Sequence, residues 1–452
     1  MNTNVDTKIA AQELFDFIGR CPTAYQTTAT IASILKEQGF SALEEGENWN
    51  LVAGGKYFVT RNQSSLIAFI MPSDLEKTTG YQIIATHGDS PSFKLKAEFE
   101  QSTAKCAKWN VERYGGMICS SWMDRPLSVA GRVVVADESG IRSLPVHLTE
   151  DIALIPNVAI HMDRTANDGK KYNMQVDMLP LVGAADSEAH LLDRVAAQLG
   201  CDKAAIVSHD LFLYVRDEGR LWGLQNEFIS APRLDDLMCT FGALKGFLGG
   251  AHENVVPVLA VFDNEEIGSS SRQGAGSSLL GDILSRVDEA VGVTDADTQG
   301  LYRRFMSSCI LSADNAHAQH PNHPEYADAQ NAPHMNEGIV IKHQSEQRYA
   351  TDAISGAIFT RICNTASVPT QTYLNRSDIR GGSTLGNIVV SQIPMLTLDI
   401  GLAQLAMHSA YETAGAQDVV HMINASKAFY HTAIQAGAGN RYDVDTKTYA
   451  ME

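Results

Sequence analysis

The sequence predicts an α/β protein with a mostly parallel central sheet, helices on both faces of that sheet, and an inserted β-rich domain. From about Ile229 onward, apolar strand-like segments alternate with helical ones, which is typical of a parallel sheet. Between residues 94 and 228, short alternating segments separated by turn residues indicate a β-rich unit. We therefore expect residues 1–93 and 229–452 to form one α/β domain, with residues 94–228 inserted into it.

The individual elements follow in chain order. The N-terminal part predicts a helix and then strands, the last of which, at 82–86, ends at His87. The inserted part contains strand-like segments at 131–135 and 211–215 and one helical segment at 188–199. Beyond the insertion, the predicted helices are 233–248, 277–287 and 352–365, and the predicted strands are Val255–Phe262 and 308–313.

Size, composition and charge exclude several classes of protein. A chain of 452 residues is longer than one ordinary core, and its 44% hydrophobic and 19% charged residues are typical of a globular protein. Apolar runs such as Val255–Phe262 are far shorter than the roughly 20 residues of a membrane-spanning helix, so no membrane partner is expected. A net charge of −18 argues against nucleic-acid binding, which needs clustered Lys and Arg.

The N-terminal segment and the cysteines predict a cytoplasmic location. The first residues contain no basic segment followed by an apolar core, which a secretion signal requires. The seven cysteines are scattered and form no CxxC pair. We expect them to be reduced thiols that bind no metal.

Three strand-like segments end in residues that can bind metals. YQIIAT leads into His87 and Asp89, VVPVLAVF is followed by Glu265 and Glu266, and SSCILSA leads into Asp314. In open α/β sheets, ligands bind at the carboxyl ends of the strands, so these residues are expected to converge on one crevice. The pattern therefore predicts a metal site.

Each of these signals has a structural alternative when it is taken alone. His87 and Asp89 could be a structural histidine beside a turn aspartate, and the Glu-Glu pair could be solvated acids at a helix N-terminus. Asp235, in PRLDDL, could be an ordinary first-turn acid of a helix. His408, in LAMHS, lies in an apolar segment that predicts a helix, where a lone histidine is more often a hydrogen-bonded core residue than a ligand.

Nine segments in a fixed order reduce the weight of those alternatives. They are FDFIGRCPTAYQ, THGDSP, VAIHMDR, PRLDDL, NEEIGS, SADNAHAQHPN, IVIKHQSEQRYAT, DIRGGSTLGNI and DIGLAQLAMHS. In this order, over more than 400 residues, the chain resembles the aspartyl aminopeptidase family of di-zinc exopeptidases, in a bacterial-type form.

The resemblance implies a site with two zinc ions per subunit. The implied metal ligands are His87 and Asp314 for one ion, Glu266 and His408 for the other, and Asp235 as the bridge. The implied catalytic residues are Glu265, as general base, and Asp89, which orients the metal site. The implied substrate-binding residues are His161, His317, Lys342 and Tyr349.

The implied activity is that of a zinc-dependent aminopeptidase, which hydrolyses peptides with a free N-terminus and prefers N-terminal Asp or Glu. Two metal ions about 3.5–4 Å apart can activate water and polarise the scissile carbonyl. An adjacent unligated carboxylate, here Glu265, can take the proton from water and pass it to the leaving amine. The ammonium group of Lys342 is a suitable partner for an acidic side chain. Co²⁺ or Mn²⁺ could replace Zn²⁺ among such ligands.

Alternative functions remain open at this point. Relatives in this class accept neutral residues such as leucine, in which case Lys342 would form a structural salt bridge. Hydrolases of N-acyl amino acids share the HxD and Glu-Glu motifs, but they are not expected to match IVIKHQSEQRYAT or LAMHS. A non-catalytic assembly or binding protein could retain the fold, although every expected ligand and the base are present.

The resemblance also implies an assembly. In the family, the inserted domain mediates a homodimer, and dimers form a dodecamer. The residue that matches His161 reaches into the active site of a neighbouring subunit.

Overall fold

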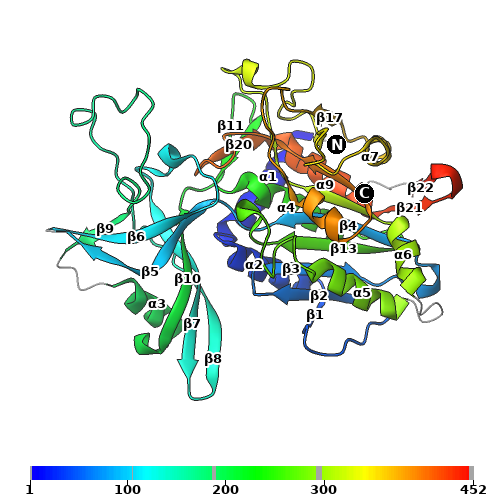
Figure 1. Cartoon of the computed structure of the whole chain (residues 1–452), viewed down its shortest axis with the longest axis horizontal. Helices are drawn as coiled ribbons and strands as arrows, with labels where there is room; N and C mark the ends of the chain where they lie inside the picture. The colour runs from blue at the N-terminus through cyan, green and yellow to red at the C-terminus, as the bar shows by residue number, and fades with distance from the viewer. Residues whose placement is uncertain (1–2, 104, 186–189, 292–297, 447–452) are drawn as a thin grey trace.

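The computed structural model describes residues 3–103, 105–185, 190–291 and 298–446. Two regions lie side by side in Figure 1: a nine-stranded sheet surrounded by helices on the right, and a six-stranded sheet on the left. The prediction of an α/β fold is confirmed, and the fold contains several sheets. The boundaries predicted for the two domains stay predictions.

The nine-stranded sheet combines strands from both ends of the chain. Its order is β1 (Ser41–Leu43), β2 (Lys56–Arg61), β3 (Ser65–Ile70), β13 (Val255–Phe262), β4 (Gly80–His87), β14 (Cys309–Ala313), β18 (Leu396–Gly401), β16 (Ile339–Lys342) and β17 (Thr370–Tyr373). The central strands β13, β4, β14 and β18 pair in parallel, whereas β3 and β16 lie antiparallel to β13 and β18. Because Phe262 pairs with His87, the segments that follow β13 and β4 leave the sheet at the same edge.

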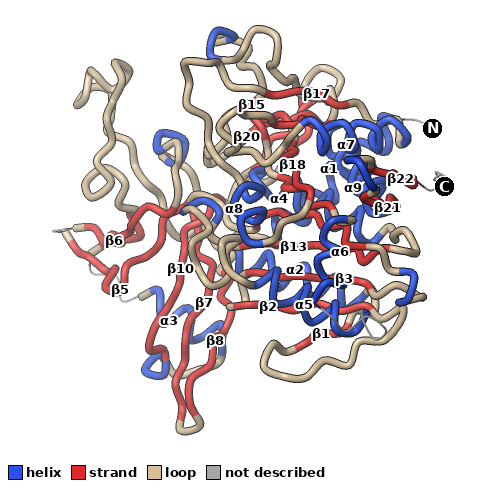
Figure 2. The backbone as a smooth tube through the Cα atoms, turned by 45° about the vertical axis from the view of Figure 1, so that its right-hand side comes forward, coloured by secondary structure: helices blue, strands red, loops and turns tan. Residues whose placement is uncertain are grey.

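Helices cover both faces of this sheet (Figure 2). Successive strand residues point to opposite faces. In β4, Ile84 therefore packs in one core, and Ile83 and Ala85 pack in the other. The helices of the Ile84 core are α1 (Thr3–Arg20), α2 (Ala24–Glu37), α4 (Leu234–Leu248), α7 (Ala353–Thr365) and α9 (Ala416–Tyr430). Those of the other core are α5 (Leu279–Val291), α6 (Thr298–Met306) and α8 (Leu385–Gln392).

The six-stranded sheet has a hydrophobic core of its own. Its order is β8 (Gly140–His147), β7 (Leu127–Asp137), β10 (Ile206–Val215), β5 (Ser92–Ser102), β6 (Cys106–Tyr114) and β9 (Leu181–Ala184), and all its pairs are antiparallel. The core contains Phe93, Trp122 and Leu213, with α3 (Leu191–Leu199) packed on it. The helix predicted for 188–199 is thus observed from Leu191, while residues 188 and 189 lie outside the described residues.

A third sheet has five short strands. Its order is β11 (Arg220–Trp222), β12 (Phe228–Ala231), β20 (Glu412–Gly415), β19 (Ala403–Leu405) and β15 (Ala316–His317). β12 ends just before α4, and β19 and β20 form an antiparallel pair. The turn that joins them contains His408.

The predicted helical environment of His408 is wrong. Ala406 and His408 have φ values of 55° and 67°, which a right-handed helix does not contain. A short strand precedes the turn and another follows it, so the apolar residues around His408 belong to a β connection. An apolar segment of this length does not distinguish a short helix from two short strands.

Candidate metal centre

The first of two acidic clusters, here called the first cluster, consists of His87, Asp235, Asp236 and Asp314. His87 ends β4, Asp314 directly follows β14, and the two aspartates lie in the first turn of α4. Each of the four side chains offers one ligand atom, and these atoms all lie within 4.8 Å of one another. All four residues are buried. The parallel pairing of β4 with β14 brings two of them together, as the strand-end pattern predicts.

The second cluster consists of Asp235, Glu266 and His408. The Nε2 atom of His408 lies 3.4 Å from Oδ2 of Asp235 and 3.3 Å from Oε2 of Glu266. The other oxygen of Asp235, Oδ1, lies 3.5 Å from Nε2 of His87 in the first cluster. One carboxylate therefore faces both clusters, each through a different oxygen.

The residues of the two clusters fit bound divalent cations. Oδ1 of Asp235, Oδ1 of Asp236 and Oε1 of Glu266 are buried and accept no hydrogen bond from the described part of the chain. Buried carboxylates without partners are costly, and metal ions are one of the few groups that stabilise them. Histidine nitrogens and carboxylate oxygens are also the ligands that zinc prefers in sites with no cysteine.

The pKa values of the clustered carboxyl groups also indicate that the two clusters lack positive charge. Burial, reinforced by neighbouring carboxylates, raises the pKa of Asp236 and of Glu266 well above the usual range. Burial also raises the pKa of Asp314. For Asp235 the effect of burial is outweighed by His408 and His87, which lower its pKa. A cation bound between the clusters would favour the ionised form of all four carboxyl groups.

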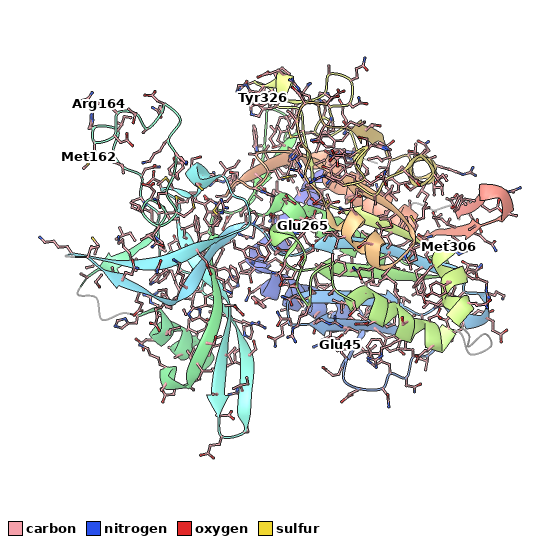
Figure 3. All side chains as sticks on the ribbon, viewed as in Figure 1. Glu45, Met162, Arg164, Glu265, Met306 and Tyr326 are labelled. Atoms are coloured by element: carbon pink, nitrogen blue, oxygen red, sulfur yellow. The ribbon has the colours of Figure 1, made fainter. Side chains whose placement is uncertain are left out.

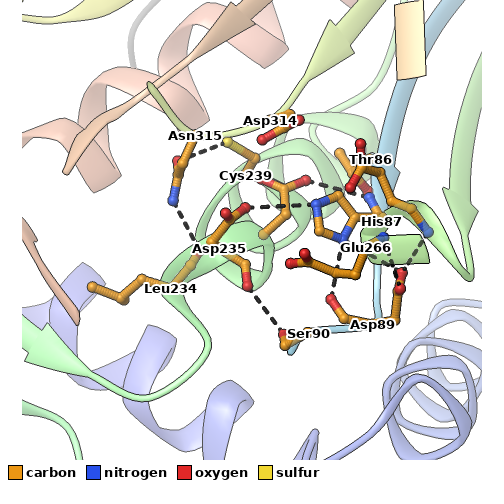
Figure 4. A network of polar contacts seen from close by, with 12 residues as sticks. Thr86, His87, Asp89, Ser90, Leu234, Asp235, Cys239, Glu266, Asp314 and Asn315 are labelled. Carbon is orange, nitrogen blue, oxygen red and sulfur yellow. Dashed lines mark hydrogen bonds and ion pairs between the residues drawn. The ribbon is translucent and has the colours of Figure 1, made fainter. Parts of the chain in front are cut away.

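Asp89 connects the first cluster to the Glu265–Glu266 pair. Its backbone carbonyl lies 3.0 Å from Nδ1 of His87, which turns the Nε2 side of the ring towards Asp235 (Figure 4). Its carboxylate accepts from the backbone N–H groups of Glu265 and Glu266, each at 3.2 Å. The Tyr114 hydroxyl donates to the same carboxylate at 2.7 Å. Asp89 thus positions three functional groups at once.

Glu265 lies half-buried directly after a tight turn. Asn264, with φ of 65°, ends the segment that leaves β13, and Glu265 begins a short 3₁₀ turn, Glu265–Ile267. Burial raises the pKa of Glu265 to about 8, and Asp314 and Asp89 add to this effect while His87 opposes it. This carboxyl group belongs to neither cluster.

Three of the four predicted substrate-binding residues lie near the first cluster. Nζ of Lys342 lies 3.8 Å from Oδ1 of Asp314, donates to the backbone carbonyl of Asn315 at 2.8 Å and lies 5.5 Å from the ring centre of Tyr349. The rings of Tyr349 and His317 lie 6.3 and 6.2 Å, respectively, from the ring of Tyr373. Lys342 and Tyr349 are buried, whereas His317 is exposed.

The fourth residue, His161, does not reach the clusters of its own chain. It is exposed and belongs to the loop that carries Met162 and Arg164. Figure 3 places that loop at the outer end of the six-stranded region, away from Glu265. The predicted role of His161 in substrate binding therefore stays a prediction.

Three residues of the site were missed by sequence reasoning. Asp236 could have been found, because it directly follows Asp235 in the same motif. Tyr114, from the six-stranded sheet, contacts Asp89, and Glu412 accepts hydrogen bonds from the backbones of Asp235 and His408. Neither Tyr114 nor Glu412 belongs to a motif that signals metal binding, and only the tertiary structure brings them to the site.

Comparisons with known proteins agree with this geometry. Residues 17–430 match the family model described as aminopeptidase I zinc metalloprotease (M18). A probable M18 family aminopeptidase 2 of Clostridium acetobutylicum is 42% identical over 428 residues, which are 93% of this chain and 98% of that protein.

Two solved structures show the same likeness. The structure of an Ape4 and Nbr1 complex has 34% sequence identity and a TM-score of 0.90, covering 94% of this chain and 86% of the matched one. The mApe1 dodecamer of S. cerevisiae has 28% identity and a TM-score of 0.81, covering 93% and 96%. The predicted family and enzyme class are thus confirmed: the chain belongs to the M18 family, the aspartyl aminopeptidase family of zinc metalloproteases, and is an aminopeptidase.

Proposed function

We propose that the protein binds two zinc ions per subunit and releases acidic residues one at a time from the N-terminus of peptides. The observation that supports this best is the position of Asp235, whose two carboxylate oxygens face two separate groups of potential ligands. His87 and Asp314 would hold one ion, Glu266 and His408 the other, and Asp235 would bridge them. Asp236 is a further potential ligand in the first cluster.

Zinc bound in this way supplies a Lewis acid that polarises the scissile carbonyl and lowers the pKa of water. Glu265 acts as the general base and then as the acid that protonates the leaving amine. Burial raises the pKa of Glu265 when no cation is bound, and two bound cations would lower that pKa again, which favours the ionised form that a general base needs. Asp89 keeps Glu265 and Glu266 in place through their backbone N–H groups.

The preference for acidic residues depends on Lys342. Burial disfavours its ammonium group, but the carboxylates of Asp314 and Asp399 outweigh that effect and raise its pKa, so the group stays charged. A buried cation beside the metal centre can bind the carboxylate of an N-terminal Asp or Glu side chain. His161, His317 and Tyr349 would complete the substrate site, with His161 supplied by a neighbouring subunit.

A preference for neutral residues is the second candidate. Nζ of Lys342 already lies 3.8 Å from Asp314 and donates to Asn315. If the Lys342 ammonium group only neutralises Asp314, it is a structural residue and cannot also bind an acidic side chain. Leucine would then be a better substrate than Asp or Glu.

We also propose a homo-oligomer, a dimer that assembles further to a dodecamer. The likeness to the mApe1 dodecamer of S. cerevisiae supports this. The loop that carries His161 also exposes the apolar side chains of Ile160, Met162 and Val176, the latter two by 83% and 70%. Exposed apolar side chains in one loop are typical of a surface that a partner covers.

A cytoplasmic location is proposed from the cysteines. All seven are free, four of them buried. Thiols that stay unpaired are typical of a reducing compartment. Among the described residues, no helix is long and apolar enough to cross a membrane.

The proposed function is tested by measuring amine release from aminoacyl substrates, with and without a chelator. The panel contains Asp, Glu, Leu, Ala and Lys, with N-acetylated Asp as the control. Chelator-sensitive cleavage of Asp and Glu alone would support the proposal, whereas cleavage led by Leu would reassign Lys342. Cleavage of only the acetylated compound would contradict aminopeptidase activity.

The Lys342→Ala variant tests the specificity in the same panel. We expect kcat/KM to fall about tenfold to a hundredfold for Asp and Glu, because a charge-assisted hydrogen bond is lost. The values for Leu and Ala should change far less. An equal loss on acidic and neutral substrates would contradict the assignment of Lys342.

A further inference from the structure

Glu412 links the two segments that bring Asp235 and His408 together. It is the first residue of β20, and it pairs with Ala231 at the end of β12. The segment after β12 continues directly into the turn of α4 that contains Asp235. The turn between β19 and β20 contains His408. Both segments therefore pass next to the Glu412 side chain.

The Glu412 carboxylate uses its two oxygens on these two segments. Oε2 accepts from the backbone N–H of Asp235 at 3.0 Å, and Oε1 accepts from the backbone N–H of His408 at 2.7 Å. Gln404 adds a longer contact to Oε1, at 3.4 Å. The residue is only 2% exposed, so water does not compete for these bonds.

The surroundings of Glu412 are unusual for a purely structural carboxylate. In the described part of the chain, no side-chain nitrogen of Lys, Arg or His forms an ion pair with its oxygens within 4.0 Å. An ionised carboxylate buried without a cation is costly. The Glu412 oxygens are held instead by the two backbone N–H groups of the segments that carry Asp235 and His408.

We propose that Glu412 is a positioning residue that fixes Asp235 and His408 relative to each other and so sets the affinity of the second cluster for its metal ion. This inference depends on the proposed two-zinc site. His408 lies in a turn with positive φ, and its Nδ1 atom has a backbone partner in Gly116 at 2.5 Å. Glu412 fixes the main chain of the same residue. Groups that orient metal ligands in this way typically change metal affinity by about 10–100-fold.

The chain offers a matched control in Asp418. This carboxylate is also fully buried, and it accepts from the backbone N–H groups of Asn336 and Gly338 at 2.6 and 3.0 Å, with Nδ1 of His421 as a further partner at 3.0 Å. It belongs to neither cluster. If Glu412 were merely a structural residue, Glu412→Gln and Asp418→Asn would have the same kind of effect.

The experiment measures zinc binding to the full-length protein by competition with a chromophoric chelator, and the unfolding temperature with and without zinc. For Glu412→Gln we expect one of two zinc ions to bind about 10–100-fold more weakly, while the other keeps its affinity. Excess zinc should restore kcat in this variant with little change in KM. For Asp418→Asn we expect a lower unfolding temperature of the zinc-free protein and unchanged zinc affinity.

Two results would overturn the inference. One is unchanged affinity for both ions in Glu412→Gln, and the other is an equal loss of affinity in Asp418→Asn. If Glu412→Gln does not fold, Glu412→Asp replaces it in the experiment. The Asp side chain keeps the charge but is too short to reach both N–H groups. Unchanged zinc affinity in Glu412→Asp would also refute the proposal. Fewer than two zinc ions in the unsubstituted protein would instead contradict the two-zinc site itself.

Discussion

The first and second clusters share Asp235 but differ in what supports them. In the first, His87 and Asp314 lie at the ends of paired parallel strands in the middle of the large sheet. In the second, Glu266 and His408 lie in connecting segments. The side chain of His87 is 1% exposed and that of His408 is 31% exposed. The core thus holds the candidate histidine ligand of the first cluster, whereas loops hold that of the second cluster.

This difference affects how stably each cluster is held and how fast a bound metal ion would exchange. Segments with few buried contacts open more readily than core strands. The second cluster compensates through contacts from elsewhere, namely Gly116 after β6 and Glu412 in β20. We therefore expect a metal ion bound in the second cluster to exchange faster than one bound in the first cluster.

The largest expected effect concerns Glu265, the proposed base, which belongs to neither cluster. Glu265→Gln should keep two zinc ions and lose about 10²–10⁴-fold in kcat, because an amide cannot accept the proton. The measurement pairs kinetics with elemental analysis, and Glu266→Gln is the control that should lose zinc. Activity within a few-fold of the unsubstituted protein would remove Glu265 as the base.

The next prediction tests the difference between the clusters directly. His408→Ala should lower the zinc content from two ions to one per subunit and leave the ion that a chelator removes slowly. Asp314→Ala should leave the ion that is removed rapidly. Elemental analysis and the time course of zinc release check both variants. Unchanged stoichiometry in His408→Ala would contradict its role as a ligand, and equal release rates from the two variants would contradict the comparison.

The smallest expected effect concerns the reach of the six-stranded sheet into the site. Tyr114→Phe removes the hydrogen bond that the hydroxyl donates to the Asp89 carboxylate and the one that it accepts from the Asn264 side chain. A hydrogen bond to a charged group is worth about 1.5–3 kcal/mol, so kcat should fall about tenfold to a hundredfold with zinc content unchanged. Tyr25→Phe is the control, because the Tyr25 hydroxyl contacts Asp210 and not Asp89. Equal kcat in Tyr114→Phe and the unsubstituted protein would show that Asp89 does not need this support.

The residues of the first cluster are easier to predict from the sequence than His408 of the second cluster, for a physical reason. The strand that ends at His87 and the strand before Asp314 are apolar runs with clear ends, so both residues could be placed at one edge of the sheet. His408 follows an apolar run that is too short to distinguish a helix from strands, and the helix predicted there is a turn. Only the family resemblance predicted that His408 belongs to the site.

The sequence by itself determined the family, the α/β fold, and which strands His87, Glu265, Glu266 and Asp314 end or follow, because apolar runs and the acids that follow them are local features of the chain. Only the tertiary structure decided that Tyr114 contacts Asp89 and that Glu412 holds the backbones of Asp235 and His408. These contacts join segments far apart in the chain. They depend on the register between strands and on the path of a turn, which no local pattern of residues encodes.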